Sequence, residues 1–392
     1  MAGVFQRLDD ALLRCSTRLR VTVIAITIAG MAVVALPHVP RPFVDYARVP
    51  WLDRLAQPAT FGPDTISDNY GAKVVLNDPS DMYVKAKVDQ TPLEAATWSK
   101  EASAPYPPAA RLIAAGLYSV GEWLGIGLYG CVLLLAVAFV GSSLVYCWRT
   151  RWYVFPLLYL NFSYFAYRFV YVQDTSYLIM LTVIMAALWL ARAGNDACHP
   201  LMALAIVIKV SPLYYVRHVL TMRPPVAAGV VAILVAGLVL PYFVWDNYLS
   251  IFRFAMENKG SWPDAVAALG VVLPVTAAIW YIETKLGFDL EDKIGWCLVP
   301  CAMWFALKMN VPRHLLIVLL VPDKRVTRNL AAAAGLAAYS LFPSLMHFGA
   351  VGPITTALLV MALVYFLGRI GWGVVRDDLR HPRRTIGWLL RT

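Results

Sequence analysis

The residues best suited to chemistry are carboxylates in one polar stretch, residues 39–108, which lies between two strongly apolar segments. Asp64 and Asp68 differ from the other acidic residues there because a Gly-Pro turn precedes them and a Gly-Ala pair follows. The chain around them can therefore lie close against a membrane surface. A carboxylate held there, partly desolvated and beside basic groups, is suited to act as a general base on an incoming hydroxyl. Taken one at a time, the same carboxylates are also typical of solvated loop charges.

The composition of the whole chain indicates a membrane protein. Of its 392 residues, 60% are hydrophobic and only 15% are charged, which exceeds what the core of a soluble domain needs. The net charge of +10 does not indicate a nucleic-acid partner, because the basic residues form short clusters between apolar runs. This is the positive-inside pattern of proteins whose partners are membrane lipids.

The cysteines and the carboxylate spacing predict neither a metal nor another cofactor. All six cysteines fall in predicted spans or at their cytoplasmic ends, so no disulfide framework is implied. Cys297 and Cys301 lie four residues apart on one helix face, but no further Cys or His accompanies them, and helix packing explains them better. No Asp-x-Asp occurs in residues 39–108, which also argues against a catalytic metal.

The elements that must position the polar stretch begin with a first span at residues 21–39. Four Arg residues precede this span, which places the N-terminus in the cytoplasm and residues 39–108 outside. Residues 109–124 keep Arg111 and Glu122 among apolar neighbours, which is typical of an interfacial helix. We therefore assign the active site to residues 39–124, on the extracytoplasmic side.

The remaining apolar runs predict an all-α bundle of about ten transmembrane helices in a single polytopic domain, residues 1–392. Leu201–Leu220 contains Lys209 and Pro212 near its middle and has basic residues near both ends, so we predict two half-helices that enter the membrane and return. Both termini are then cytoplasmic. The further predicted spans are residues 126–147, 153–172, 175–191, 226–245, 264–282, 294–309, 312–322, 329–346 and 351–371.

The order of residues in the outer stretch resembles a known family. Asp64 is followed eight residues later by Ala72, and then come Leu76, Pro79, Tyr83 and the run Tyr106-Pro107-Pro108. This order is similar to the first outer loop of glycosyltransferase family 87. Its members are membrane enzymes of the GT-C superfamily that use polyprenyl-phosphate sugars, and they include the phosphatidylinositol-mannoside mannosyltransferases.

Later segments carry the same resemblance. The stretch from Lys209 to Pro212 is similar to a Lys-x-x-Pro segment of the family, Gln173 to its Gly-Gln segment, and His314 to an outward-facing histidine. There are two departures: Asp68 stands where the family carries Tyr, and Val172 replaces the glycine before Gln173. They leave open whether Asp64 or Asp68 is the base and whether the sugar is mannose.

The resemblance implies an inverting transfer of a monosaccharide from a polyprenyl-phosphate donor to a hydroxyl of a lipid or glycan acceptor, at the outer face of the plasma (inner) membrane. The phosphate leaves with its own charge, so the site needs one base and cations for the phosphate. The implied catalytic residues are Asp64, Asp68 and His314. The implied phosphate-binding residues are Lys209, Arg168 and Arg313, and those for the substrate are Tyr83, Tyr106 and Gln173.

Two other classes of protein fit parts of the pattern. A transporter or flippase of a lipid-linked or polar solute also has many spans with a few buried charges, but such proteins usually show two related halves and short outer loops. This chain shows neither feature. A non-catalytic scaffold would leave Lys209 and the carboxylate-rich loop without a role.

Overall fold

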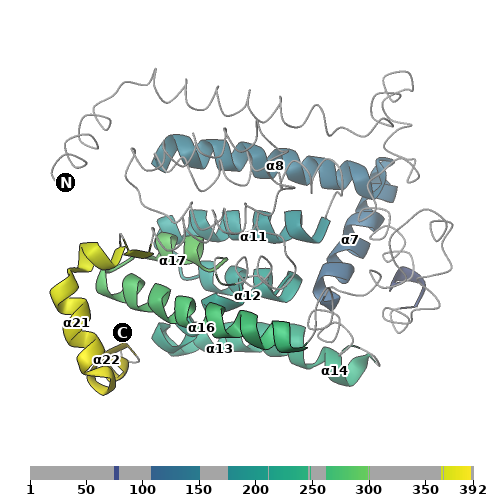
Figure 1. Ribbon diagram of the computed structural model, residues 1–392. Helices are drawn as coiled ribbons and strands as arrows, with labels where there is room; N and C mark the ends of the chain where they lie inside the picture. The colour runs from purple at the N-terminus through teal and green to yellow at the C-terminus, as the bar shows by residue number, and fades with distance from the viewer. Residues whose placement is uncertain are drawn as a thin grey trace, which may run out of the picture.

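The computed structural model describes residues 75–78, 107–150, 175–210, 212–245, 248, 262–298, 300, 363–364 and 366–389. Within these ranges the chain is helical and contains no strand (Figure 1), in agreement with the predicted all-α class. The predicted first span and the spans at 153–172, 312–322 and 329–346 lie outside the described residues.

Helix α7 (Pro108–Leu124) lies across the ends of other helices. Pro108 occupies the first turn, where a missing N–H costs nothing, and the helix ends at Gly125, whose φ of 70° gives a left-handed cap. In Figure 1, α7 runs crosswise to α8 (Gly127–Thr150) and contacts α8, α11 and α12. Its bounds agree with the interfacial helix predicted at 109–124.

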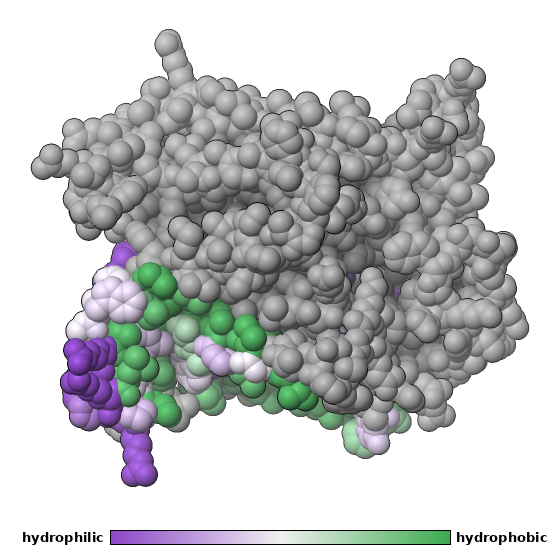
Figure 2. Space-filling view, viewed as in Figure 1, coloured by the Kyte–Doolittle hydropathy of each residue, from purple (hydrophilic) through white to green (hydrophobic). Residues whose placement is uncertain are grey.

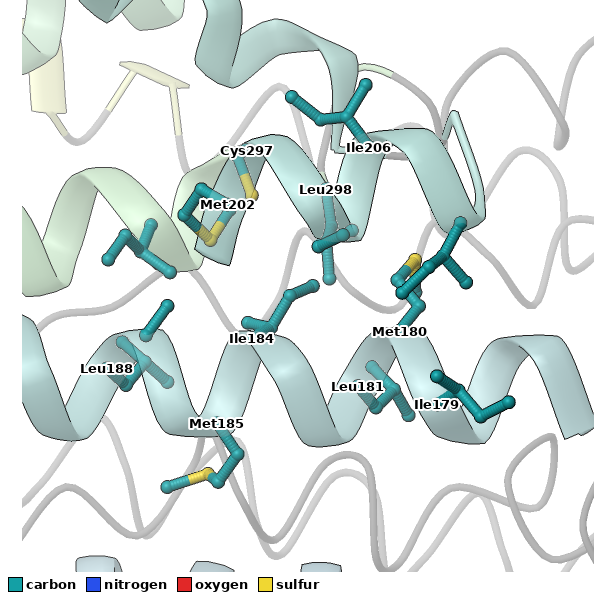
Figure 3. Close-up of a cluster of buried hydrophobic side chains, with 14 of the residues drawn as sticks. Ile179, Met180, Leu181, Ile184, Met185, Leu188, Met202, Ile206, Cys297 and Leu298 are labelled. Carbon is teal, nitrogen blue, oxygen red and sulfur yellow. The ribbon is translucent and has the colours of Figure 1, made fainter. Parts of the chain in front are cut away.

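The core of the described bundle is built around α11 (Thr175–Arg192). This helix is apolar on all sides, as expected for a helix with neighbours all round. In Figure 3, Ile184 points to the side on which Met202 and Leu298 lie, whereas Met185 points to the opposite side. Ser143 of α8 donates a hydrogen bond to the Met185 sulfur at 3.6 Å. Helix α11 is thus packed between α8 on one side and α12 (Cys198–Ile208) on the other.

The chain breaks after α12, as the sequence predicts. The helix ends at Ile208, Lys209 is extended (φ −152°, ψ 115°), and the 3-10 helix η7 (Leu213–Thr221) follows. In a continuous helix Pro212 would leave the carbonyl of Ile208 without its N–H donor and its ring would clash with that carbonyl, which explains the break. With 11 residues, α12 is about 16 Å long. This is about half the thickness of a bilayer core.

One helical stretch in the described ranges, Pro224–Val244, is long and apolar enough to cross a membrane, with a mean hydropathy of 2.4. It consists of α13 (Pro224–Leu234), a π-helical turn η8 (Val235–Val239) and α14 (Pro241–Val244). Gly237 of η8 lies so close to α12 that an added Cβ would sit 2.0 Å from a Val207 methyl. The stretch agrees with the span predicted at 226–245, and its close approach to α12 requires glycine.

The remaining described helices continue from this stretch toward the C-terminus. Helix α16 (Trp262–Lys285) agrees in its bounds with the span predicted at 264–282. Helix α17 (Leu290–Trp296) begins about four residues before the predicted span at 294, because Asp289 accepts a hydrogen bond from the backbone of Asp292 and caps it. Two short amphipathic helices, α21 (Trp372–Arg380) and α22 (Pro382–Leu389), follow near the C-terminus.

Candidate functional site

The structure describes one of the nine predicted site residues, Lys209. The other eight lie outside the described residues: Asp64, Asp68, Tyr83, Tyr106, Arg168, Gln173, Arg313 and His314. Two parts of the polar stretch are described: residues 75–78, and Pro107, which begins the segment that leads into α7.

A small apolar cluster joins the polar stretch to the crosswise helix. Val75, Ala115 of α7 and Tyr248 are each at most 4% exposed and pack together, with Tyr118 and Trp245 at the edge. We call these five residues the Val75 cluster. It brings three distant parts of the chain to one place: the segment between Asp68 and Tyr83, the helix after the Tyr-Pro-Pro run, and the turn after α14.

Arg111 is a further candidate for the site, beyond the residues predicted from the sequence. It lies in the first turns of α7, just after the buried Pro107 and Pro108, and it is only 6% exposed. Glu122, near the other end of the same helix, is exposed. A guanidinium carries five N–H donors, so a buried arginine can hold structural partners and still donate to an anionic ligand. The sequence feature that could have identified Arg111 is its place one turn after the Tyr-Pro-Pro run. Amphipathic spacing alone does not show whether a charged residue in such a helix is buried or interfacial.

Lys209 stands where α12 ends and the chain turns back. Its backbone N–H donates to the Ala205 carbonyl at 3.0 Å, and its side chain is half-buried. A cation at the end of a helix interacts favourably with the helix dipole, which is a structural reason for a lysine at this position. Helix α12 contacts α7, which contributes Ala115 to the Val75 cluster. Lys209 therefore follows directly on a helix that is packed against α7.

A second group of charges lies between η7 and α16. Arg217 forms an ion pair with Glu283, whose side chain is fully buried, and the Tyr214 hydroxyl donates to the same carboxylate at 3.2 Å. The Arg217 guanidinium also lies over the Tyr214 ring, 4.6 Å from its centroid, and near the Trp280 ring at 5.5 Å. We call these four residues the Arg217 cluster. Its charges compensate each other across two helices.

Neighbouring polar contacts extend this group toward the start of α12 and toward α17. The Tyr215 hydroxyl and His199 Nδ1 are 2.8 Å apart, and the rings of Tyr215 and the buried His218 have centroids 5.0 Å apart. Burial, and then the nearby Arg217 guanidinium, lower the pKa of Lys293. In the sequence alone, the basic residues here indicate only the cytoplasmic side.

Glu291 of α17 ties together the ends of two further helices. Its carboxylate accepts a hydrogen bond from the Tyr146 hydroxyl of α8 at 2.8 Å and lies 3.5 Å from Arg192 of α11. Arg192 is partly exposed, with 42% of its side-chain surface accessible, so this pair contributes little by itself. The buried Tyr146 bond is the stronger link because both groups are shielded from water.

The described part of the chain contains no group of three or more side chains that could hold a metal ion. Cys297 lies in the apolar core with Met202 and Ile184, consistent with packing as its role (Figure 3).

No family model matches the chain, and neither the curated proteins nor the solved structures include a match. The resemblance to glycosyltransferase family 87 therefore stays a prediction from the sequence.

Proposed function

We propose that this protein is a polytopic membrane glycosyltransferase. It transfers a monosaccharide, in the first instance mannose, from a polyprenyl-phosphate donor to an acceptor hydroxyl on the extracytoplasmic side. The observation that carries the proposal is the Val75 cluster. It joins the segment between Asp68 and Tyr83 to the helix after the Tyr-Pro-Pro run, as expected if both motifs belong to one site.

The proposed reaction uses one carboxylate and a set of cations. Asp64 or Asp68 removes the proton of the acceptor hydroxyl, whose oxygen attacks the anomeric carbon of the sugar. The bond between that carbon and the phosphate oxygen breaks, and polyprenyl phosphate leaves with its charge. Cations that stabilise this charge accelerate the step.

Two described cations support the phosphate-binding part of the proposal. Arg111 is buried at the start of α7, and Lys209 follows a helix that contacts α7. A guanidinium is well suited to hold a phosphate through two parallel hydrogen bonds. Arg168, Arg313 and His314 complete the proposed set from outside the described residues.

The proposed fold is a GT-C-like bundle of about ten spans with a re-entrant pair, in the plasma (inner) membrane. Contacts between helix ends support this arrangement. The ends of α8, α11 and α17 that we predict to be cytoplasmic meet at Glu291, and the predicted outer residues meet in the Val75 cluster. Labelling from outside should modify single cysteines introduced at Asp81 but not at Lys324. The reverse result would overturn the orientation.

The direct test is a transfer assay with the purified full chain in liposomes. Radiolabelled polyprenyl-phosphate mannose is supplied with envelope lipid and glycan fractions as acceptors, and polyprenyl-phosphate glucose tests the sugar. We expect label to appear on an acceptor with the mannose donor. Failure to turn over any polyprenyl-phosphate sugar contradicts the proposal.

Variants at Lys209 test phosphate binding within the same assay. Lys209→Met keeps the length of the stem and removes the charge, whereas Lys209→Arg keeps the charge. We expect weaker donor binding from the first variant and near wild-type binding from the second. Wild-type binding by Lys209→Met would assign Lys209 a structural role only.

A transporter of a lipid-linked or polar solute is the second candidate. It is favoured by the break between α12 and η7 and by the buried Arg217–Glu283 pair, since transporters use broken helices and buried charges near their sites. The two functions differ in their products. A transporter moves an intact lipid-linked sugar across the liposome membrane, whereas the proposed enzyme releases polyprenyl phosphate.

A further inference from the structure

The C-terminal helices α21 and α22 present a basic surface with exposed apolar side chains beside it. Residues 372–389 contain four Arg and two Asp, and all four Arg side chains are exposed: Arg376, Arg380, Arg383 and Arg384. Figure 2 shows hydrophilic surface over these helices next to hydrophobic surface. In the described residues, no ion pair involves any of these four arginines.

The apolar side chains follow helical spacing on α21. Trp372 and Leu379 are seven residues apart, so they lie on one face, and they are 57% and 76% exposed. Arg376 and Arg380, four residues apart, lie beside that face. Ile386 of α22 is a further exposed apolar residue, at 56%. Large apolar side chains flanked by arginines are typical of helices that lie in a membrane interface.

The tail is held in a fixed place against α16. Asp378 accepts hydrogen bonds from Lys285 and from the Tyr281 hydroxyl, each at 2.7 Å, and its backbone carbonyl accepts one from Thr385 at 2.9 Å. The Lys285 ammonium lies 4.4 Å from the centroid of the Trp388 ring. These contacts provide hydrogen-bond partners for Asp378, whereas the four arginines of the tail remain exposed. They also attach the tail directly to the end of a helix of span length.

From these observations we propose that α21 and α22 dock on anionic phospholipid head groups of the membrane that the chain crosses. The arginines bind the head-group phosphates, and Trp372, Leu379 and Ile386 enter the boundary between head groups and acyl chains. Charge complementarity favours this occupant over a neutral lipid surface, because each Arg near an anionic leaflet strengthens binding. The inference rests on the proposed membrane location and not on the proposed reaction.

Hydrogen–deuterium exchange of the full chain in nanodiscs tests the proposal. One set of nanodiscs contains phosphatidylcholine alone, and the other also contains phosphatidylglycerol. We expect amides of residues 372–389 to exchange about tenfold more slowly with the anionic lipid, and added salt to weaken the difference. Equal exchange of these amides in both lipids overturns the proposal. This is also the result expected if the basic tail binds an acidic protein and not anionic lipid.

Matched variants separate charge from fold. Replacement of the four arginines by Gln should abolish the lipid dependence, and replacement of the same four by Lys should retain it. Lipid-dependent protection in the Gln variant contradicts the proposal, as does its loss in the Lys variant. Peptides from Pro224–Val244 are the internal control. If these peptides are protected in both lipids while exchange of residues 372–389 does not depend on lipid charge, the proposal for the tail fails and the membrane location stands.

Discussion

The two ends of the described bundle use polar side chains differently. At the end formed by η7, α17 and the last turns of α16, charges pair with each other across helices, as in Arg217 with Glu283. At the other end, formed by α7 and the Val75 cluster, an apolar contact joins segments that flank the predicted site residues, and Arg111 is buried on the same helix. We call these the paired end and the α7 end.

This difference indicates where chemistry is expected. A buried ion pair whose partners compensate each other holds helices together and has little charge left for a ligand. The α7 end instead joins segments that flank the predicted site residues, and the guanidinium of Arg111 is suited to donate to an anionic group. We therefore expect changes at the α7 end to alter activity and changes at the paired end to alter stability.

The largest expected effect is on catalysis, at the stretch that precedes α7. Asp64→Asn preserves size but removes the proton acceptor, so the transfer rate should fall by about 10² to 10⁴ while donor binding is retained. Asp68→Asn is the matched variant. If only the Asp68 variant is inactive, the base is Asp68. If both stay active, the transporter hypothesis becomes the better one.

At the paired end, Glu283→Gln should lower stability more than activity. The change leaves Arg217 buried without a compensating charge, which costs about 3–5 kcal/mol of the free energy of unfolding. Thermal unfolding in detergent measures the loss. The control is Asp196→Asn, which breaks an exposed pair with Arg223 and should cost at most about 1 kcal/mol. Equal, small losses would show that the buried pair has no special role.

Between the two ends, Gly237→Ala tests the close packing of η8 on α12. The added methyl meets Val207, two residues before Lys209, so we expect a loss of about 1–3 kcal/mol in unfolding experiments. Gly229→Ala, in the same helical stretch, places its methyl in open space and should be neutral or stabilising. A similar response of both variants would contradict the close approach.

The smallest expected effect concerns Asp378 of α21, which contacts the last turn of α16 at the paired end. The hydrogen bond from Lys285, and a further one from Tyr281, lower the pKa of Asp378 below its ordinary value of 3.8. A lowered carboxyl pKa means that the contact stabilises fully above pH 3.8 and is lost as the pH falls through the folded-state pKa. The protection of the α21 amides, relative to the intrinsic exchange rate at each pH, should therefore fall below pH 3.8, and Asp378→Asn should remove this dependence.

The positions of helices and helix breaks could be predicted where they depend on local sequence. Apolar length predicted the stretch at 226–245, Lys209 and Pro212 predicted the break that follows α12, and charged residues among apolar neighbours predicted a helix at 109–124. The paired end was not predictable, because Arg217 and Glu283 are 66 residues apart and only packing brings them together. The burial of Arg111 was not predictable for a related reason, because the sequence shows its helix but not what covers it.

Photo-crosslinking distinguishes the two ends most directly. A polyprenyl-phosphate analogue with a diazirine near its phosphate is irradiated with the full chain in liposomes, and the labelled peptides are identified by mass spectrometry. We expect adducts in residues 61–83, in the first turns of α7 and near Lys209, and we expect polyprenyl-phosphate mannose to prevent them by competition. Competable adducts confined to η7, α16 and α17 would contradict the assignment of the donor site to the α7 end.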